Sequence, residues 1–314
     1  MGPAERFAGP FLFREGTRMI RAAMLAAALL LWSPMASADP ADCPIARPAG
    51  GDSADRAKAF FPAASRADLD ALAQCLANPD PTVRDDFAFA LWSSGLRGER
   101  LTAGQMRHAL AQLTGMAAGL DDAAGFRRPF AILTLSEVAR TDRISPWMTE
   151  AELHGLAETA AGYLRGVTDY RGFVPGEGWR HGVAHGSDLA LQLALNPRLA
   201  RADAELLLGA IAAQVAPAAS PYYHHGESAR LARPVLFLAK RADLDDAAWA
   251  AWFKALHPDT GVRWKEAYAS DAGLAAVHNT TAFASAVYVN AADAQDPAIK
   301  RLAPLAAGLL KALP

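Results

Sequence analysis

From Ser65 to the C-terminus, apolar residues recur at helical spacing, and the strict alternation typical of strands is almost absent. Ser65 is a suitable N-cap for a first helix that runs to about Asn78 and places Leu69, Leu72 and Leu76 on one face. This pattern predicts an all-α fold. Gly, Pro, Asp and Asn separate the later segments. We expect helices after Thr82 and near residues 102–118, 123–140, 149–166, 177–195, 201–215, 225–240, 245–256, 272–291 and 297–313.

A weak internal repeat predicts how these helices pack. Residues 80–91 have the order of a HEAT-type repeat, in which a turn is followed by an Arg and then by apolar residues. Residues 127–133 and 230–236 share the Arg-then-apolar order, and the separation of Arg84 from Arg128 lies within the usual spacing of about 40–47 residues. We therefore expect HEAT-like antiparallel helix pairs stacked into a curved solenoid or toroid.

The composition excludes several classes of protein. The chain has 314 residues, of which 52% are hydrophobic and 20% charged, so a sizeable core is available and extensive disorder is not expected. The formal net charge is −2 and there is no basic run, which argues against a nucleic-acid partner. We expect residues 65–314 to form a single helical-repeat domain.

The first 38 residues resemble a secretory signal peptide. Arg18 and Arg21 flank the start of an apolar run, residues 22–32, and the small-residue sequence Ala-Ser-Ala follows at residues 36–38. The run has about 11 residues, which is short for a bilayer span. We expect cleavage after Ala38, no membrane span in the mature chain, and a periplasmic or secreted protein, with Met19 as the true start. An uncleaved anchor is the alternative.

Residues 39–64 are rich in Pro, Ala, Gly and Asp and are interpreted as an irregular N-terminal arm. The chain has two cysteines, Cys43 and Cys75. In an oxidising compartment they can pair and tie this arm to the first helix. Two free thiols are the alternative, and two cysteines are too few for a thiolate metal cluster.

The stretch Trp179–Leu195 is the strongest candidate for a functional site. Wound as an α-helix at about 100° per residue, it places His181, His185, Asp188 and Gln192 on one stripe, while the remaining positions are apolar or small. A helix that is apolar nearly all round is usually buried. Two imidazoles, a carboxylate and an amide on such a helix indicate an enclosed polar pocket.

This stripe permits metal chemistry or acid/base chemistry. His181 and His185 are four residues apart, a spacing at which two imidazoles can share a zinc ion. Asp188 can be a third ligand or can orient His185 through a hydrogen bond. Gly182 occupies the position of the Glu in the metalloprotease pattern, which disfavours that protease class. The alternative is a buried His–Asp network that only fixes helix packing.

A second polar cluster lies at residues 222–230. His225 or Glu227 can face the stripe and complete a tetrahedral metal site or supply a general base, and Tyr223 can line a pocket wall. The alternative is a local ion pair between Glu227 and Arg230, three residues apart. The loop at residues 169–178 has three glycines and a proline, and its acidic residues can cap the helix that follows.

These residues resemble the signature of the bacterial family called domain of unknown function 2785. The family pattern is Asp-x-Arg-Gly-Tyr/Phe-Val, then Gly-Trp-x-His, then Ala-His-x-x-Asp. The matching positions here are Asp169, Arg171, Gly172, Phe173, Val174, Gly178, Trp179, His181, His185 and Asp188. The family's Glu-x-x-Arg-Leu element is similar to Glu227, Arg230 and Leu231, although Ser228-Ala229 departs from it. The resemblance covers about residues 66–290 and implies an all-α fold with a shared polar site, but no particular activity.

Two hypotheses of function follow from the sequence. In the first, the protein is a hydrolase or lyase with a divalent metal such as zinc, or with acid/base groups. Its candidate catalytic residues are His181, His185, Asp188 and Glu227, its metal ligands His181, His185, Asp188 and His225, and its substrate-binding residues Arg171, Trp179, Tyr223 and Arg230. In the second, the protein is a non-catalytic helical-repeat binding module for a peptide, a sugar or a partner protein.

Overall fold

Most of the chain is helical, as the periodicity predicts. The computed structural model describes residues 43–46, 51–218, 221–256, 264 and 267–314, so the expected signal peptide lies outside the described residues. The helices are α1 (Ser53–Phe60), α2 (Arg66–Gln74), α3 (Pro81–Val83), α4 (Ala90–Arg97), α5 (Ala103–Ala118), α6 (Arg127–Ile144), α7 (Glu150–Arg165), α8 (Gly182–Ala194), α9 (Arg201–Val215), α10 (Glu227–Leu238), α11 (Asp246–Ala255), α13 (Asp271–Ala292), α14 (Pro297–Lys300) and α15 (Leu302–Ala312). Short 3₁₀ turns at Cys75–Ala77 and Ala267–Ala269 and a π-helical turn at Arg84–Phe89 complete the helical elements.

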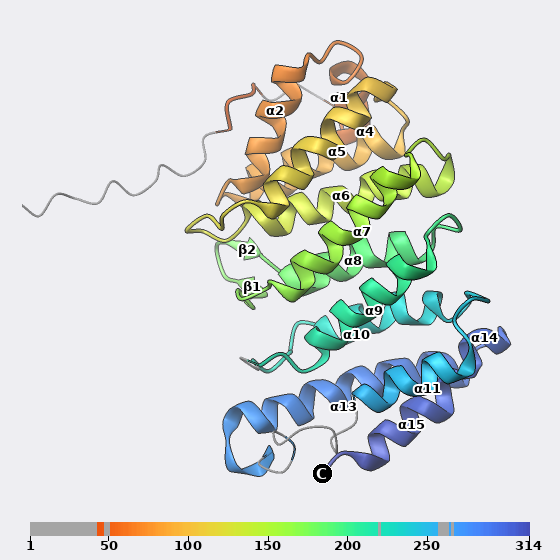
Figure 1. The fold of residues 1–314 in the computed structure, drawn as a ribbon. Helices are drawn as coiled ribbons and strands as arrows, with labels where there is room; N and C mark the ends of the chain where they lie inside the picture. The colour runs from red at the N-terminus through yellow and green to blue at the C-terminus, as the bar shows by residue number, and fades with distance from the viewer. Residues whose placement is uncertain (1–42, 47–50, 219–220, 257–263, 265–266) are drawn as a thin grey trace, which may run out of the picture. The chain divides into compact units, whose positions relative to one another are not determined.

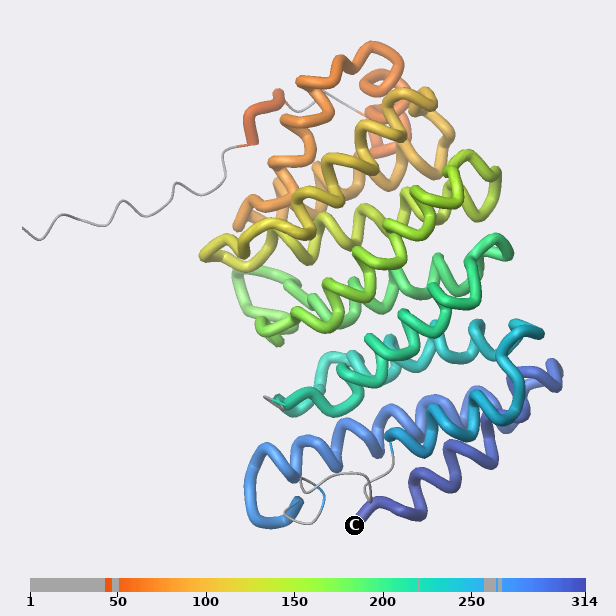
Figure 2. Tube along the Cα trace, viewed as in Figure 1, coloured from red at the N-terminus to blue at the C-terminus, as the bar shows by residue number. Residues whose placement is uncertain are grey.

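The helices of residues 43–314 are arranged in two layers (Figure 1). One layer contains α5, α7 and α9, and the other contains α6, α8, α10 and α13. Consecutive helices pair across the layers, α5 with α6, α7 with α8 and α9 with α10, as the chain trace shows (Figure 2). Within its layer α8 packs between α6 and α10, so it is enclosed on several sides. This position explains why α8 is apolar around most of its circumference.

Capping residues determine where several helices begin. Ser65, Thr102 and Thr149 each accept a hydrogen bond from the backbone N–H three residues later, and the side chain at that later position bonds back to the cap. These three capping boxes satisfy backbone donors that the helix leaves free. They account for the agreement between the expected and observed starts of α2, α5 and α7.

The interpretation of residues 39–64 as an irregular arm is wrong over Ser53–Phe60, which forms α1. The side chain of Asp52 caps this helix by accepting from the N–H groups of Ala54 and Asp55. Composition did not indicate α1, because the helix is short and has few apolar residues.

Cys43 and Cys75 are joined by a disulfide, which links the segment before α1 to the end of α2. Of the two alternatives that the sequence left open, the structure has the bonded one. Among the helices described, none has the combination of length and apolarity that crossing a bilayer requires.

The expected helix at residues 177–195 begins later than predicted, at Gly182. The residues before it form a two-stranded antiparallel hairpin, β1 (Phe173–Val174) and β2 (Gly178–Trp179), in which Phe173 pairs with Trp179. Gly176 and Gly178 have φ angles of 83° and 81°, a region that glycine adopts without strain. Trp179 therefore lies on a strand. Of the three glycines in the expected loop, Gly176 lies in the hairpin turn, Gly178 lies on β2 and Gly172 precedes β1.

Candidate functional site

His181 is the residue that joins the hairpin to α8. It is the N-cap of the helix, with φ 52° and ψ 39°, a left-handed conformation that is uncommon for residues other than glycine. Backbone hydrogen bonds from His181 N to Arg171 O and from Arg180 N to Gly172 O, both 3.1 Å, hold the two sides of the hairpin together up to this point. His181 therefore lies outside the helical stripe on which the sequence placed it.

Three imidazoles and one indole gather at this turn, and we call His181, His185, His225 and Trp179 the imidazole cluster. The His181 ring lies 5.8 Å from the His185 ring and 6.5 Å from the His225 ring, centroid to centroid. Trp179 stacks on His181 at 4.7 Å and 29°, and it meets the edge of His225 at 5.6 Å. His225, from the second polar cluster of the sequence, thus lies beside His181. The sequence predicts that either His225 or Glu227 can face this site.

His181 is held in the cluster by a hydrogen bond. Its Nε2 lies 2.9 Å from the carbonyl oxygen of His225. Because a carbonyl oxygen only accepts, Nε2 carries the proton and Nδ1 is the unprotonated nitrogen of a neutral ring. Burial, and after it the neighbouring imidazole of His185, lowers the pKa of His181 from 6.5 to about 4. The ring is therefore neutral near pH 7.

His185 is buried without satisfying its polar atoms. The residue is 7% exposed, and neither ring nitrogen has a hydrogen-bond partner among the residues that the structure describes. Its Nδ1 lies 3.9 Å from Oδ2 of Asp188, which is too far for a hydrogen bond, and its ring meets the edge of Phe130 at 5.6 Å. The expected hydrogen bond between His185 and Asp188, which would orient the imidazole, is not formed.

Asp188 is bound instead to Arg230 of α10. Nη2 of Arg230 donates to Oδ2 of Asp188 at 2.9 Å, and Nε donates to Oδ1 at 3.3 Å. Glu227, the expected local partner of Arg230, is buried and accepts a hydrogen bond of 2.9 Å from the backbone N–H of His225. The local ion pair between Glu227 and Arg230 is therefore replaced by an ion pair that joins α8 to α10.

The expected metal ligands His181, His185, Asp188 and His225 do not form a metal site. Across the described ranges, no three His, Cys, Asp or Glu side chains are placed to hold a metal ion. Asp188 is engaged by Arg230, and Nε2 of His181 is engaged by a backbone carbonyl. Two of the four expected ligands thus already bind other protein groups.

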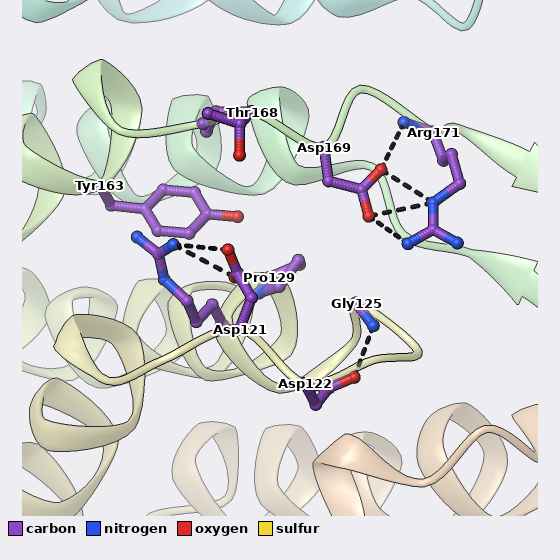
Figure 3. Close-up of a pocket in the computed structure, with 10 residues that line it drawn as sticks. Asp121, Asp122, Gly125, Pro129, Tyr163, Thr168, Asp169 and Arg171 are labelled. Atoms are coloured by element: carbon purple, nitrogen blue, oxygen red, sulfur yellow. Dashed lines mark hydrogen bonds and ion pairs between the residues drawn. The ribbon is translucent and has the colours of Figure 1, made fainter. Parts of the chain in front are cut away.

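Of the expected substrate-binding residues, only Trp179 belongs to the imidazole cluster; Arg230 binds Asp188 beside it, and Arg171 and Tyr223 are bound elsewhere. Arg171 turns to Asp169, donating from Nε to both carboxylate oxygens at 2.9 and 3.0 Å (Figure 3). Tyr223 is buried, and its hydroxyl donates to Gln214, with 2.8 Å between Oη and Oε1. Tyr223 is therefore part of the core packing, and Arg171 belongs to a different part of the surface.

Two residues beside the cluster, Gly172 and Phe173, match the family signature but were given no role at the site from the sequence. Phe173 is 48% exposed, and its ring lies 5.3 Å from that of Trp179, its cross-strand partner. At Gly172 an added Cβ would lie only 2.2 Å from Nδ1 of His225, so this position requires glycine for the imidazole to pack against the backbone. The sequence signal for these roles was a glycine followed directly by an aromatic residue, Gly172-Phe173, within the loop of residues 169–178.

The fold and the site define a predominantly α-helical protein with a partly buried imidazole cluster at the start of a central helix. The chain belongs to the family described as "Protein of unknown function (DUF2785)", whose model matches residues 116–289. The matched residues include α6 to α10 and the whole imidazole cluster. No curated protein and no solved structure matches the chain.

Proposed function

We propose that this protein is an exported, HEAT-like helical-repeat binding protein that recognises a peptide segment through Phe173 and Trp179. The two-layer packing of α5 to α10, with each helix paired to the next, supports a solenoid of stacked helix pairs. Solenoids of this type present extended surfaces to peptides and partner proteins.

One observation carries the proposal, namely the exposure of a rigid aromatic pair. Phe173 is 48% and Trp179 is 41% exposed, although both are large apolar side chains. The hairpin pairing and the stacking of Trp179 on His181 hold the two rings in place before any partner arrives. Rigid aromatic residues of this kind are frequent binding hot spots, because they bury much area for little loss of conformational entropy.

The catalytic hypothesis has weaker support. A hydrolase or lyase using His185 as a base needs a group that orients the imidazole, and the carboxylate of Asp188 lies 3.9 Å from it while bound to Arg230. The carboxylate of Glu227, the other expected base, is occupied by the backbone N–H of His225. These contacts favour a supporting role for the three imidazoles, which pack against Trp179 of the exposed aromatic pair or against one another.

Export is part of the proposal. It rests on the signal-like residues 1–38 and on the disulfide between Cys43 and Cys75, since structural disulfides persist mainly in oxidising compartments. We place the mature protein in the periplasm or outside the cell, with no membrane span remaining after cleavage.

Selection of peptides from a displayed random library against the mature protein tests this function. We expect selected peptides to bind the wild-type protein and to lose at least tenfold in affinity with Trp179→Ala, measured by calorimetry. Tyr288→Ala is the matched control, since Tyr288 is also 41% exposed but lies on α13. Equal weakening by both variants, or peptides that bind Trp179→Ala as tightly as wild type, would refute the proposed function.

A further inference from the structure

A polar cavity of about 370 Å³ lies beside the start of α8, among the α5–α6 loop, the end of α7 and the loop that follows it. Its polar lining includes Asp121, Arg128, Tyr163, Thr168, Asp169 and Arg171 (Figure 3). The residues of the imidazole cluster do not line it. Its volume lies within the range of small-molecule sites, about 300–1,000 Å³.

The charged groups of this cavity are already bound within the protein. Asp122 accepts hydrogen bonds from the backbone N–H groups of Phe126 and Arg127. Both carboxylate oxygens of Asp121 accept from Nη1 of Arg128 at 3.1 Å. Both carboxylate oxygens of Asp169 accept from Nε of Arg171 at 2.9 and 3.0 Å. A ligand with a strong net charge would have to displace one member of these pairs and face the remaining opposite charge. The lining disfavours simple anions because its three carboxylates outnumber its two guanidiniums, and it disfavours simple cations because each carboxylate already accepts from a protein donor.

An uncharged hydroxyl is left without a partner. Tyr163 is 6% exposed, and its hydroxyl points into the cavity without a hydrogen-bond partner in the part of the chain that the structure describes (Figure 3). Burial raises the pKa of Tyr163, so the phenol stays protonated and can donate. The hydroxyl oxygen itself stays accessible from the cavity, where a ligand or water can form the hydrogen bond that no described protein group makes.

The start of α8 packs directly against this hydroxyl. A Cβ added at Gly182, the first residue of α8, would lie 2.9 Å from the Tyr163 hydroxyl oxygen. Because Gly182 has no side chain, the phenol can lie between α8 and the cavity, where its proton is available to an acceptor oxygen of a ligand.

We propose that this cavity binds a neutral, hydroxyl-rich small molecule of the sugar or polyol class. Each ligand hydroxyl can accept from the phenol of Tyr163 and donate to the remaining lone pairs of Asp121 or Asp169, without breaking either ion pair. Thr168 supplies one more hydroxyl at the cavity wall. This site is independent of the aromatic pair proposed for peptide binding.

Saturation-transfer NMR on the mature protein, with glucose, maltose and trehalose as probes at millimolar concentration, tests the proposal. We expect at least one of these sugars to bind, and Tyr163→Phe to weaken that binding at least tenfold while leaving the melting temperature unchanged. Tyr222→Phe is the control, because that hydroxyl bonds to Asp271 and does not line the cavity. Trp179→Ala should leave sugar binding intact, which separates this site from the proposed peptide site.

Three outcomes would overturn the proposal. One is the absence of transfer to all three sugars, and another is equal sugar binding by wild type and Tyr163→Phe. The third is tighter binding of inorganic phosphate than of any sugar, since phosphate would mark the site as one for anions.

Discussion

Arg230 holds both carboxylate oxygens of Asp188 in a two-point contact, with distances of 3.3 Å from Nε and 2.9 Å from Nη2. The two residues are 42 positions apart and belong to adjacent helices of one layer, α8 and α10. Both side chains are largely shielded from solvent, so the pair is screened less than a surface ion pair. It therefore connects two neighbouring helices of the fold.

Removing one partner of this ion pair should destabilise the protein. With Arg230→Met the carboxylate of Asp188 loses both donors, and we expect the free energy of unfolding to fall by about 1–3 kcal/mol. Urea denaturation at pH 7 measures the change. Arg201→Met is the control, since Arg201 and Glu205 form a pair with both side chains about half exposed and should contribute less than about 1 kcal/mol. Equal losses in the two variants would contradict the special role of the Asp188 pair.

Replacing His185 by an apolar residue should be harmless to stability. Both ring nitrogens are buried without partners, so His185→Phe removes two unsatisfied polar atoms while it keeps an aromatic ring. We expect the free energy of unfolding to stay the same or to rise by about 1 kcal/mol.

The control for His185 is Asn279→Leu. Asn279 is fully buried, but its side chain accepts from the N–H of Tyr223 and donates to the carbonyl of Pro221. We expect this substitution to destabilise by about 2 kcal/mol, because it leaves those two backbone groups unpaired. If thermal unfolding shows that His185→Phe lowers stability as much as Asn279→Leu does, the prediction is wrong, and the His185 ring is hydrogen-bonded within a packing network.

The stability of the protein should decline on mild acidification because of His181. Its pKa is lowered to about 4 in the folded state, against about 6.5 in the unfolded chain, so the unfolded state binds the extra proton between these values. The contribution of His181 to the free energy of unfolding should therefore fall as the pH decreases from about 6.5 to about 4, and this contribution should change no further below pH 4. Since the ring is only partly buried, we expect about 1–2 kcal/mol after solvent screening.

His181→Asn isolates this effect, because Asn tolerates the left-handed conformation of the helix cap but does not titrate. Urea denaturation of both proteins at several pH values should show a weaker dependence in the variant between pH 6.5 and 4. Parallel curves would mean that other groups cause the acid sensitivity.

The disulfide should contribute substantially to stability. It closes a loop between residues 32 positions apart, for which the chain-entropy relation gives about 3–4 kcal/mol. We expect Cys43→Ser with Cys75→Ser to lower the free energy of unfolding by this amount, measured in guanidinium chloride. A reductant should destabilise the wild type to the same extent and leave the double variant unchanged. A double variant as stable as the oxidised protein would contradict this prediction.

The helices were predictable because their signals are local. Ser65, Thr102 and Thr149 are followed three residues later by a side chain that completes a capping box, and such a signal depends on only a few consecutive residues. The burial of α8 was also predictable, because a helix with apolar residues on most faces has to be covered by other elements. The helix α1 was missed, since its cap at Asp52 precedes a segment with little apolar character.

The sequence by itself determined the helical class of the chain, most of its helix starts, and the residues that gather at the start of α8. The tertiary structure decided how those residues are paired. The hairpin turns His181 out of the helical stripe toward His225, and the packing of α8 on α10 gives Arg230 to Asp188 instead of to Glu227. Spacing along a chain predicts which side chains share a helix face, but a hydrogen bond between helices depends on how the helices are placed in space. For the same reason only the structure revealed the cavity beside Tyr163, which two segments far apart in the sequence, residues 121–129 and 163–171, form together.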